Sequence, residues 1–183
     1  MIQKCNNGKT LIFGVGNRLR GDDGFGSCFA EALKRCGIRC CDVIVAETMH
    51  VYALDYIKGY DVIIILDVVL EDASPGTILV EEIDPSNVRE SDLTDELKTI
   101  TAHYFGPHHL VILARKLGYF SGKAYLLGIV PASLYPSQHV VSVALRNSLP
   151  KYYEVFRELA SKFGCKVPPL SCIEREFEQV CLL

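Results

Sequence analysis

Residues 10–26 read TLIFGVGNRLRGDDGFG, and this stretch decides the fold that we expect for the chain. Its apolar start followed by two close glycines indicates a buried strand that ends in a sharp turn, and the run from Gly24 onward is typical of a helix start. Asp22 and Asp23 therefore lie on the loop that leaves a strand. In an open α/β sheet that loop lies at the carboxyl end of the strand, where such folds bind their ligands.

The rest of the chain alternates between strand-like and helix-like patterns. Further strands are predicted at 42–46, 61–67, 76–83 and 124–130. Helices are predicted at 24–36, 49–57, 108–117, 140–163 and 173–183. The apolar run at 61–67 lacks alternation, which is typical of a parallel strand covered on both faces. The strand at 76–83 follows too soon for a parallel return, so it should run antiparallel at an edge. These patterns predict a three-layer α/β/α sandwich whose mostly parallel sheet has about five strands.

The chain is long enough for one large domain. We expect residues 1–164 to form a single α/β domain and residues 165–183 to form a C-terminal tail packed on it. Residues 84–100 are polar and acidic, which predicts a long surface loop. Pro150 interrupts the helical pattern at 140–163, so that we expect a kink or two helices meeting near Leu149.

Composition narrows the possible partners and compartment. The chain has 183 residues, of which 49% are hydrophobic and 22% charged, as is ordinary for a globular protein. A net charge of -3 gives no electrostatic reason to bind nucleic acid. No stretch reaches about 18 consecutive apolar residues, and the start MIQKCNNGKT lacks the apolar core of a signal peptide. We therefore expect a cytoplasmic protein that binds neither nucleic acid nor a membrane.

Eight cysteines are many for a cytoplasmic protein. They stand at positions 5, 28, 36, 40, 41, 165, 172 and 181, and no two have C-x-x-C spacing. Cys28 and Cys36 fall in the helical pattern at 24–36, where a free cysteine commonly packs as a small apolar residue. We expect that role for both, because disulfides are rare inside cells other than those of hyperthermophiles.

Several familiar active-site motifs are missing from the sequence. Gly14 and Gly16 begin a dinucleotide-binding pattern, but Leu19 stands where its third glycine belongs, and the two acids that follow would repel a pyrophosphate. The chain also has no H-E-x-x-H, G-x-S-x-G or Walker sequence. The patterns of zinc proteases, serine hydrolases and phosphate-binding loops are therefore excluded.

Three polar residues remain at the ends of predicted strands. Asp23 follows the first strand, Asp67 ends the apolar strand at 61–67, and His103 precedes the helix that leads into the last strand. If the strands are parallel, all three lie at one edge of the sheet. Two carboxylates and an imidazole can hold a divalent transition metal and leave positions open for water or substrate. Taken singly, either aspartate can instead cap a helix or turn, and the histidine can lie on the surface.

The sequence resembles the nickel-iron hydrogenase maturation endopeptidases over about residues 10–165. The resemblance rests on GVGNRLRGDDGFG at 14–26, IIILDVV at 63–69, PGT at 75–77, TAHYFG at 101–106, LARKLGYF, and LLGIVP at 126–131. It implies that Asp23, Asp67 and His103 bind nickel, with zinc or another divalent ion as a possible substitute. The family's histidine, two residues, then glycine spacing fits His103 rather than His108 or His109, which we interpret as surface residues at a helix start.

The resemblance also implies a reaction and a partner. Such proteases remove a short C-terminal extension from the hydrogenase large-subunit precursor after nickel insertion. Asn17 then either orients the loop or the peptide, or simply stabilises the turn after Gly16. The chain departs from many relatives at Glu47-Thr48-Met49, where a glycine-rich turn is often found, so its substrate specificity is open.

Two other functions share part of this pattern. A signalling receiver domain also has an acid pair after its first strand and an aspartate ending its third, but it needs a lysine at the end of the last strand, where Ile129-Val130-Pro131 stands. A non-catalytic nickel carrier would use the same three ligands. A receiver would be phosphorylated on Asp67, and a carrier would bind nickel without shortening a precursor.

Overall fold

The computed structural model describes residues 8–49, 51–84, 106–135 and 141–181, and within these ranges it contains one five-stranded sheet. The strands are β1 (Thr10–Val15), β2 (Asp42–Ala46), β3 (Val62–Val68), β4 (Ile78–Glu82) and β5 (Lys123–Ile129), in the order β2-β1-β3-β5-β4. Four of them run parallel, and only β4 at the edge runs antiparallel. The predicted sheet, including its antiparallel edge strand, is confirmed.

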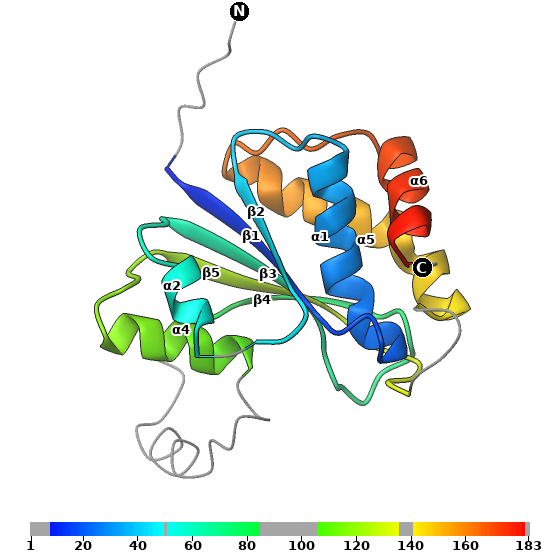
Figure 1. Cartoon of the computed structure of the whole chain (residues 1–183), viewed down its shortest axis with the longest axis horizontal. Helices are drawn as coiled ribbons and strands as arrows, with labels where there is room; N and C mark the ends of the chain where they lie inside the picture. The colour runs from blue at the N-terminus through cyan, green and yellow to red at the C-terminus, as the bar shows by residue number, and fades with distance from the viewer. Residues whose placement is uncertain (1–7, 50, 85–105, 136–140, 182–183) are drawn as a thin grey trace, which may run out of the picture.

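The parallel strands end together at one edge of the sheet. Leu66 of β3 pairs with Gly14 of β1 on one side and with Leu127 of β5 on the other. Asp67 lies opposite Gly128 one position later. The loops after β1, β3 and β5 therefore emerge side by side, near the start of α1 in Figure 1.

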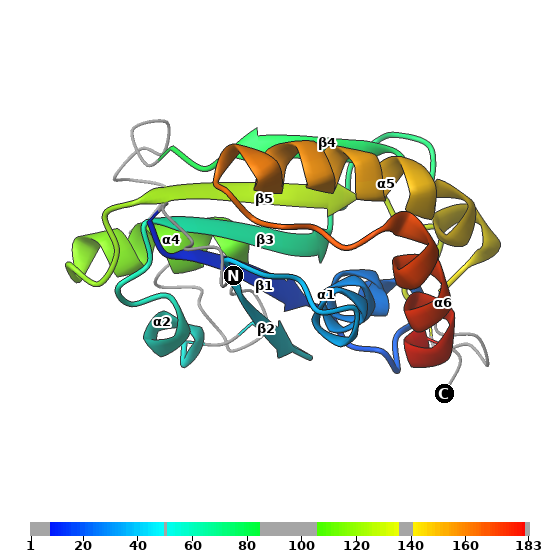
Figure 2. The ribbon, with the colours of Figure 1, turned by 90° about the horizontal axis from the view of Figure 1, so that it is seen from above.

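Helices cover both faces of the sheet. They are the 3-10 helix η1 (Gly21–Gly24) and the α-helices α1 (Phe25–Arg35), α2 (Ala53–Tyr56), α4 (Pro107–Lys116), α5 (Val143–Lys162) and α6 (Leu170–Cys181). Helices α1, α5 and α6 pack on one face, and α2 and α4 on the other (Figure 2). This arrangement confirms the predicted three-layer sandwich.

Alternating side chains of β1 enter two separate cores. Ile12 contributes to the core under α1, α5 and α6, whereas Leu11 and Phe13 contribute to the core under α2 and α4. The first core is rich in aromatic side chains. Phe25 of α1 has its ring centroid 4.8 Å from that of Tyr152 and 5.2 Å from that of Phe177. Helix α6 thus contributes to the same core as the start of α1.

Three sequence expectations need correction or narrowing. Pro150 lies inside α5, which is one continuous helix, so the alternative of two helices meeting near Leu149 is wrong. Its N-terminus is anchored because the hydroxyl of Ser142 accepts a hydrogen bond from the Leu145 amide at 3.4 Å. The helix predicted at 49–57 is reduced to the single turn α2. The predicted loop at 84–100 lies almost entirely outside the described residues.

The expectation that Cys28 and Cys36 are free is also wrong. Cys28 at the start of α1 is bonded to Cys181 of α6, and Cys36 at the end of α1 is bonded to Cys172 of α6. The Cα–Cα distance is 6.0 Å in both pairs, within the usual range for disulfides. Cys28 is fully buried, as an apolar residue would be, but its sulfur is crosslinked. Helical periodicity predicted the burial and carried no information about the partner.

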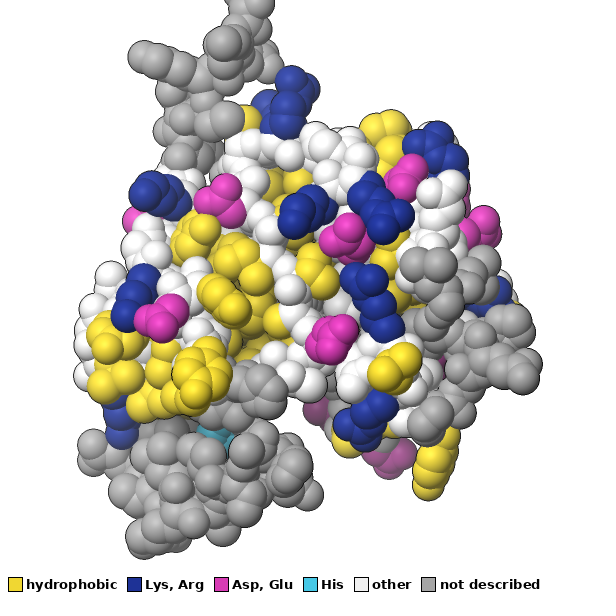
Figure 3. All heavy atoms as spheres, in the orientation of Figure 1, with side chains coloured by type: hydrophobic (Ala, Val, Ile, Leu, Met, Phe, Trp, Pro, Cys, Tyr) yellow, Lys and Arg dark blue, Asp and Glu magenta, His cyan; other side chains and the backbone are white. Residues whose placement is uncertain are grey.

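The face of the molecule shown in Figure 3 has an apolar region and a charged region. Figure 3 shows apolar side chains gathered over α2 and α4, and side chains of both charges over α1. Exposed apolar residues of the first region are Val51, Tyr52, Tyr56, Leu117 and Tyr119. Within the part of the chain that the structure describes, no helix combines the length and apolarity required to cross a membrane.

The start of α1 approaches the sheet closely because Gly26 has no side chain. A Cβ at this position would collide with the carbonyl oxygen of Leu66 and would lie 2.6 Å from that of Val15. The helix therefore rests directly on the ends of β1 and β3. This contact determines how close the preceding residues, Asp22 and Asp23, lie to the edge of the sheet.

We predict that Gly26→Ala lowers the free energy of unfolding by about 3 kcal/mol, because backbone on both sides must move to admit the methyl group. Gly37→Ala is the matched control, since nothing lies within 4 Å of its Cβ position and only its positive φ of 74° opposes alanine. That strain should cost about 1 kcal/mol. Urea unfolding monitored by circular dichroism measures both, and equal losses would contradict the close-contact explanation.

Candidate active site

Asp67 occupies the end of β3, where the sheet gives way to loop. Its Oδ1 accepts a hydrogen bond from the Val68 amide at 2.8 Å. The pKa of this carboxyl is raised to about 7: burial raises it most, the hydrogen bond from the Val68 amide opposes the rise, and the nearby charge of Asp23 adds to it. A carboxyl that changes charge near neutral pH is characteristic of functional sites. The shift also shows that Asp23 and Asp67 lie close enough to interact electrostatically, as the sequence predicted.

Asp23 approaches the same edge from η1. Its Oδ2 accepts a hydrogen bond from the backbone amide of Asn17 at 2.9 Å. The side-chain oxygen of Asn17 in turn accepts from the Leu19 amide at 2.8 Å, which stabilises the turn after β1. Gly16, with φ of 135°, allows the turn to pass against the backbone of Asp23, where a Cβ would collide with the Asp23 carbonyl oxygen. This loop is therefore fixed around the Asp23 carboxylate.

Asp22 has a different task from its neighbour, and the sequence did not reveal that task. Its side chain is buried and accepts three amide hydrogen bonds, from Ala132 at 2.7 Å, Ser133 at 3.1 Å and Ser142 at 2.6 Å. These donors belong to the loop after β5 and to the residue that caps α5. A buried carboxylate requires several such donors. Asp22 is thus a positioning residue that holds distant segments against the loop after β1.

An open groove lies between the loops that leave this edge of the sheet. Its volume is about 540 Å³, and it is lined by Arg20, Leu70, Pro131, Ala132, Ser133, Leu134 and Tyr135. The lining comes from the loops that follow β1, β3 and β5, the same three that emerge side by side. Leu70 and Tyr135 are 76% and 82% exposed, so their apolar surface is available to a partner. Gly21 lets the walls approach each other, since a Cβ there would lie 2.7 Å from the Tyr135 carbonyl oxygen.

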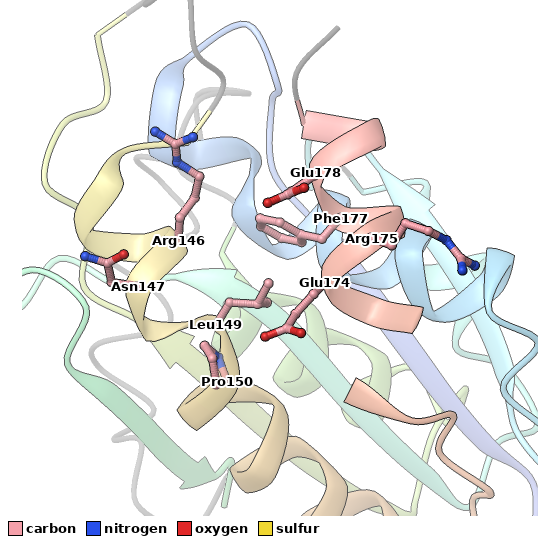
Figure 4. Close-up of a pocket in the computed structure, with 8 residues that line it drawn as sticks. All are labelled: Arg146, Asn147, Leu149, Pro150, Glu174, Arg175, Phe177 and Glu178. Atoms are coloured by element: carbon pink, nitrogen blue, oxygen red, sulfur yellow. The ribbon is translucent and has the colours of Figure 1, made fainter. Parts of the chain in front are cut away.

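A second cavity of about 600 Å³ lies between α5 and α6 (Figure 4). Glu174 and Glu178 of α6 extend toward α5, whereas Arg175 points away from it. None of its lining residues comes from the loops after β1, β3 or β5. It is therefore separate in composition from the edge that carries Asp23 and Asp67.

Of the three histidines considered in the sequence, only His108 and His109 lie among the described residues. His103 lies outside the described residues, so the third predicted metal ligand stays a prediction. His108 and His109 lie in the first turn of α4, as expected. The ring Nε2 of His108 is 3.0 Å from Oε1 of Glu81, and the Nδ1 of His109 accepts from the Gly106 amide at 3.3 Å. Both rings are thus engaged on the α4 side of the sheet.

Two carboxylates by themselves make an incomplete metal site. Among residues 8–49, 51–84, 106–135 and 141–181, no group of three or more His, Cys, Asp or Glu side chains is placed to hold a metal ion. Asp23 and Asp67 nevertheless supply oxygen donors that suit a divalent cation, and a cation would favour the ionised form of Asp67. The described residues therefore fit two ligands of the predicted set of three.

Known proteins match this chain over most of its length. The sequence model of the HycI family, described as hydrogenase maturation protease, matches residues 29–158. The hydrogenase expression/formation protein HupD of Thiocapsa roseopersicina is 26% identical over 158 residues, which cover 84% of this chain and 68% of the relative. The HupD protein of Rhizobium leguminosarum bv. viciae is 25% identical over 182 residues, which cover 93% and 88% of the two chains.

Solved structures share the fold. The hydrogenase maturating endopeptidase HybD from E. coli superimposes with a TM-score of 0.67 at 23% identity, covering 89% of this chain and 98% of that one. A hydrogenase 2 maturation peptidase from a Thaumarchaeota archaeon gives a TM-score of 0.60 at 25% identity, covering 83% and 97%. Because the family match spans more than half of the chain, the protein belongs to the hydrogenase maturation proteases and is a peptidase.

Proposed function

We propose that this protein removes the C-terminal extension of a nickel-iron hydrogenase large-subunit precursor once nickel has been inserted. The observation that carries the proposal is the pairing of Asp23 and Asp67 at the carboxyl edge of the sheet, with the pKa of Asp67 near 7. In this proposal the nickel ion belongs to the substrate. It docks on Asp23, Asp67 and His103, and thereby brings the scissile bond to the groove.

The chain's own residues have separable tasks in this reaction. Asp23 is held by the Asn17 amide and keeps a fixed orientation toward the edge. Asp67 must lose its proton to bind a cation, because only the carboxylate is a good ligand. Asp22 holds the loop after β5 in place and so preserves the shape of the groove. The exposed apolar side chains of the groove offer a surface to the peptide next to the scissile bond.

Removing Asp67 should abolish recognition of the loaded precursor. We expect Asp67→Ala to slow cleavage of a nickel-loaded precursor by about 100-fold or more, since even residues that support metal ligands contribute 10–100-fold. Asp72→Ala, which removes an exposed acid on the same loop, is the matched control and should cleave normally. Mass spectrometry of the precursor before and after incubation measures the lost extension. Full processing by Asp67→Ala would refute metal docking, and nickel binding without any cleavage by the wild type would favour a carrier.

The pKa of Asp67 predicts a proton released on metal binding. At pH 6 the carboxyl is mostly protonated, so binding must expel its proton, and affinity should rise about tenfold per pH unit until it levels above pH 7. Calorimetric titration with nickel in buffers of different ionisation enthalpy counts these protons. His103 would contribute as well, so the quantity to compare is the difference between the wild type and Asp67→Asn. The same count in both proteins would contradict the assignment.

The same pKa shift affects the stability of the metal-free protein. Between about pH 4 and pH 7 the native state keeps a proton on Asp67 that the unfolded state has lost, so stability should fall as pH rises through this window. Asp67→Asn removes this dependence and should be the more stable protein above pH 7, by about 1–3 kcal/mol. Urea unfolding at pH 5 and pH 8 measures how much the free energy of unfolding of each protein changes between the two pH values.

The groove makes a separate prediction about substrate affinity. Leu70→Lys places a charge on its apolar wall, and we expect KM for the precursor to rise about tenfold, because burial of one leucine contributes about 1.5–3 kcal/mol. Leu19→Lys adds the same charge on the neighbouring loop, at a residue that is 80% exposed and outside the groove lining. Steady-state cleavage assays give both KM values. A similar rise in the two variants would show that general charge, and not the groove, is responsible.

A further inference from the structure

The loop after β1 carries two arginines whose surroundings differ. Arg18 lies against the start of α1, where its Nε donates to the Ser27 hydroxyl at 3.5 Å and its Nη2 donates to the Ser27 carbonyl at 3.5 Å. Arg20 instead lines the open groove between the loops that leave the carboxyl edge of the sheet. Of the two, Arg20 is therefore the one that a molecule in this groove would meet.

Arg20 is the single charged residue among the described residues that line the groove. Its side chain is exposed and makes no hydrogen bond or ion pair to any residue that the structure describes. The acids that follow it in the sequence bind elsewhere, since Asp22 accepts three backbone amides and Asp23 accepts one. Glu71 and Asp72 belong to the loop after β3 but are not among the lining residues. The described part of the chain thus supplies no carboxylate to this guanidinium.

The remaining lining offers apolar surface and few available donors. Leu70 and Pro131 contribute hydrocarbon to the walls. The backbone amides of Ala132 and Ser133 already donate to Asp22 and are not available to an anion. A peptide that fills the groove would displace water from around the guanidinium, and an ion pair formed there would be less screened than one in open solvent. The groove is therefore suited to an apolar peptide that carries one acid.

The backbone holds Arg20 close to Asp23. The Arg20 amide donates to the Asn17 carbonyl at 3.0 Å, and the Asp23 amide donates to the Arg20 carbonyl at 3.3 Å. Arg20 stands three positions before Asp23. Their Cα atoms therefore lie within about 11 Å of each other. An extended peptide covers this distance in about four residues.

We propose that Arg20 is a specificity-determining residue that binds an Asp or Glu side chain of the precursor, located within about five residues of the cleavage site. This inference rests on the proposed function, because the occupant of the groove is the precursor. The acid pairs with the guanidinium, and apolar side chains next to it in the peptide cover Leu70 and Tyr135. A precursor with Lys or Arg in place of that acid is disfavoured, since like charges then meet in the groove.

A charge swap between the two proteins tests this pairing. Steady-state cleavage of a nickel-loaded precursor is measured with the wild type, Arg20→Gln and Arg20→Glu. We expect KM to rise about tenfold in Arg20→Gln and further in Arg20→Glu, with kcat changed less than about twofold, because the ion pair contributes to binding and not to bond cleavage. Replacing the paired acid of the precursor by Lys should raise KM for the wild type and lower it for Arg20→Glu.

Lys34→Glu is the matched control, because Lys34 is an exposed residue of α1 that does not line the groove. It makes the same change of charge and should keep the wild-type KM. A similar rise in KM for Lys34→Glu and Arg20→Glu would overturn the inference.

Two other results overturn the inference and leave the proposed function in place. One is cleavage by Arg20→Glu with the wild-type KM, and the other is a raised KM that no acid-to-Lys replacement near the cleavage site corrects. If the wild type cleaves no precursor, the proposed function fails, and binding of the precursor to the immobilised protein then measures the same swap as a change in Kd. No binding by the wild type, or equal binding by the wild type and Arg20→Glu, overturns the inference as well.

Discussion

One buried carboxylate, that of Asp22, holds together the parts of the chain that form the candidate site. Its three accepted hydrogen bonds reach more than 100 residues along the sequence, from the loop after β1 to the loop after β5 and the cap of α5. Because the charge is withdrawn from water, none of these bonds can be lost without leaving a buried charge poorly solvated. The groove is therefore a preformed feature, and the hydrogen bonds of Asp22 hold one of its walls in place.

The adjacent Asp23 and Asp67 illustrate the opposite arrangement. Among the residues that the structure describes, each carboxylate accepts one hydrogen bond, from a backbone amide, and the charge of Asp23 raises the pKa of Asp67. Two neighbouring acids with so few donors in this part of the chain favour a cation or a proton between them. Asp22 is thus held by three amides and has a structural task, whereas Asp23 accepts from one amide among the described residues and, in the proposed function, keeps its carboxylate for a cation.

Much of the fold could be predicted from periodicity alone. The uninterrupted apolar run that became β3, and the short separation before β4, were enough to give a parallel sheet with an antiparallel edge. The place of Asp67 at the end of β3 followed directly. Side-chain partners were not accessible in this way, because the amides that bind Asp22 and the sulfurs that bind Cys28 and Cys36 depend on contacts more than 100 residues distant. Of the two outcomes expected at Pro150, two separate helices proved wrong, because a helix with a firm N-terminal cap can lose one internal hydrogen bond and continue.

The disulfides Cys28–Cys181 and Cys36–Cys172 also change the topology of the molecule. They join residues 153 and 136 positions apart, so nearly the whole domain is contained in covalent rings. A break in the backbone anywhere between residues 37 and 171 would open a ring without producing two separate pieces. The two pieces would stay linked through the disulfides between α1 and α6. Refolding after such a break would therefore remain intramolecular. A peptidase built in this way could be nicked in its surface loops and still keep the edge that carries Asp23 and Asp67 assembled.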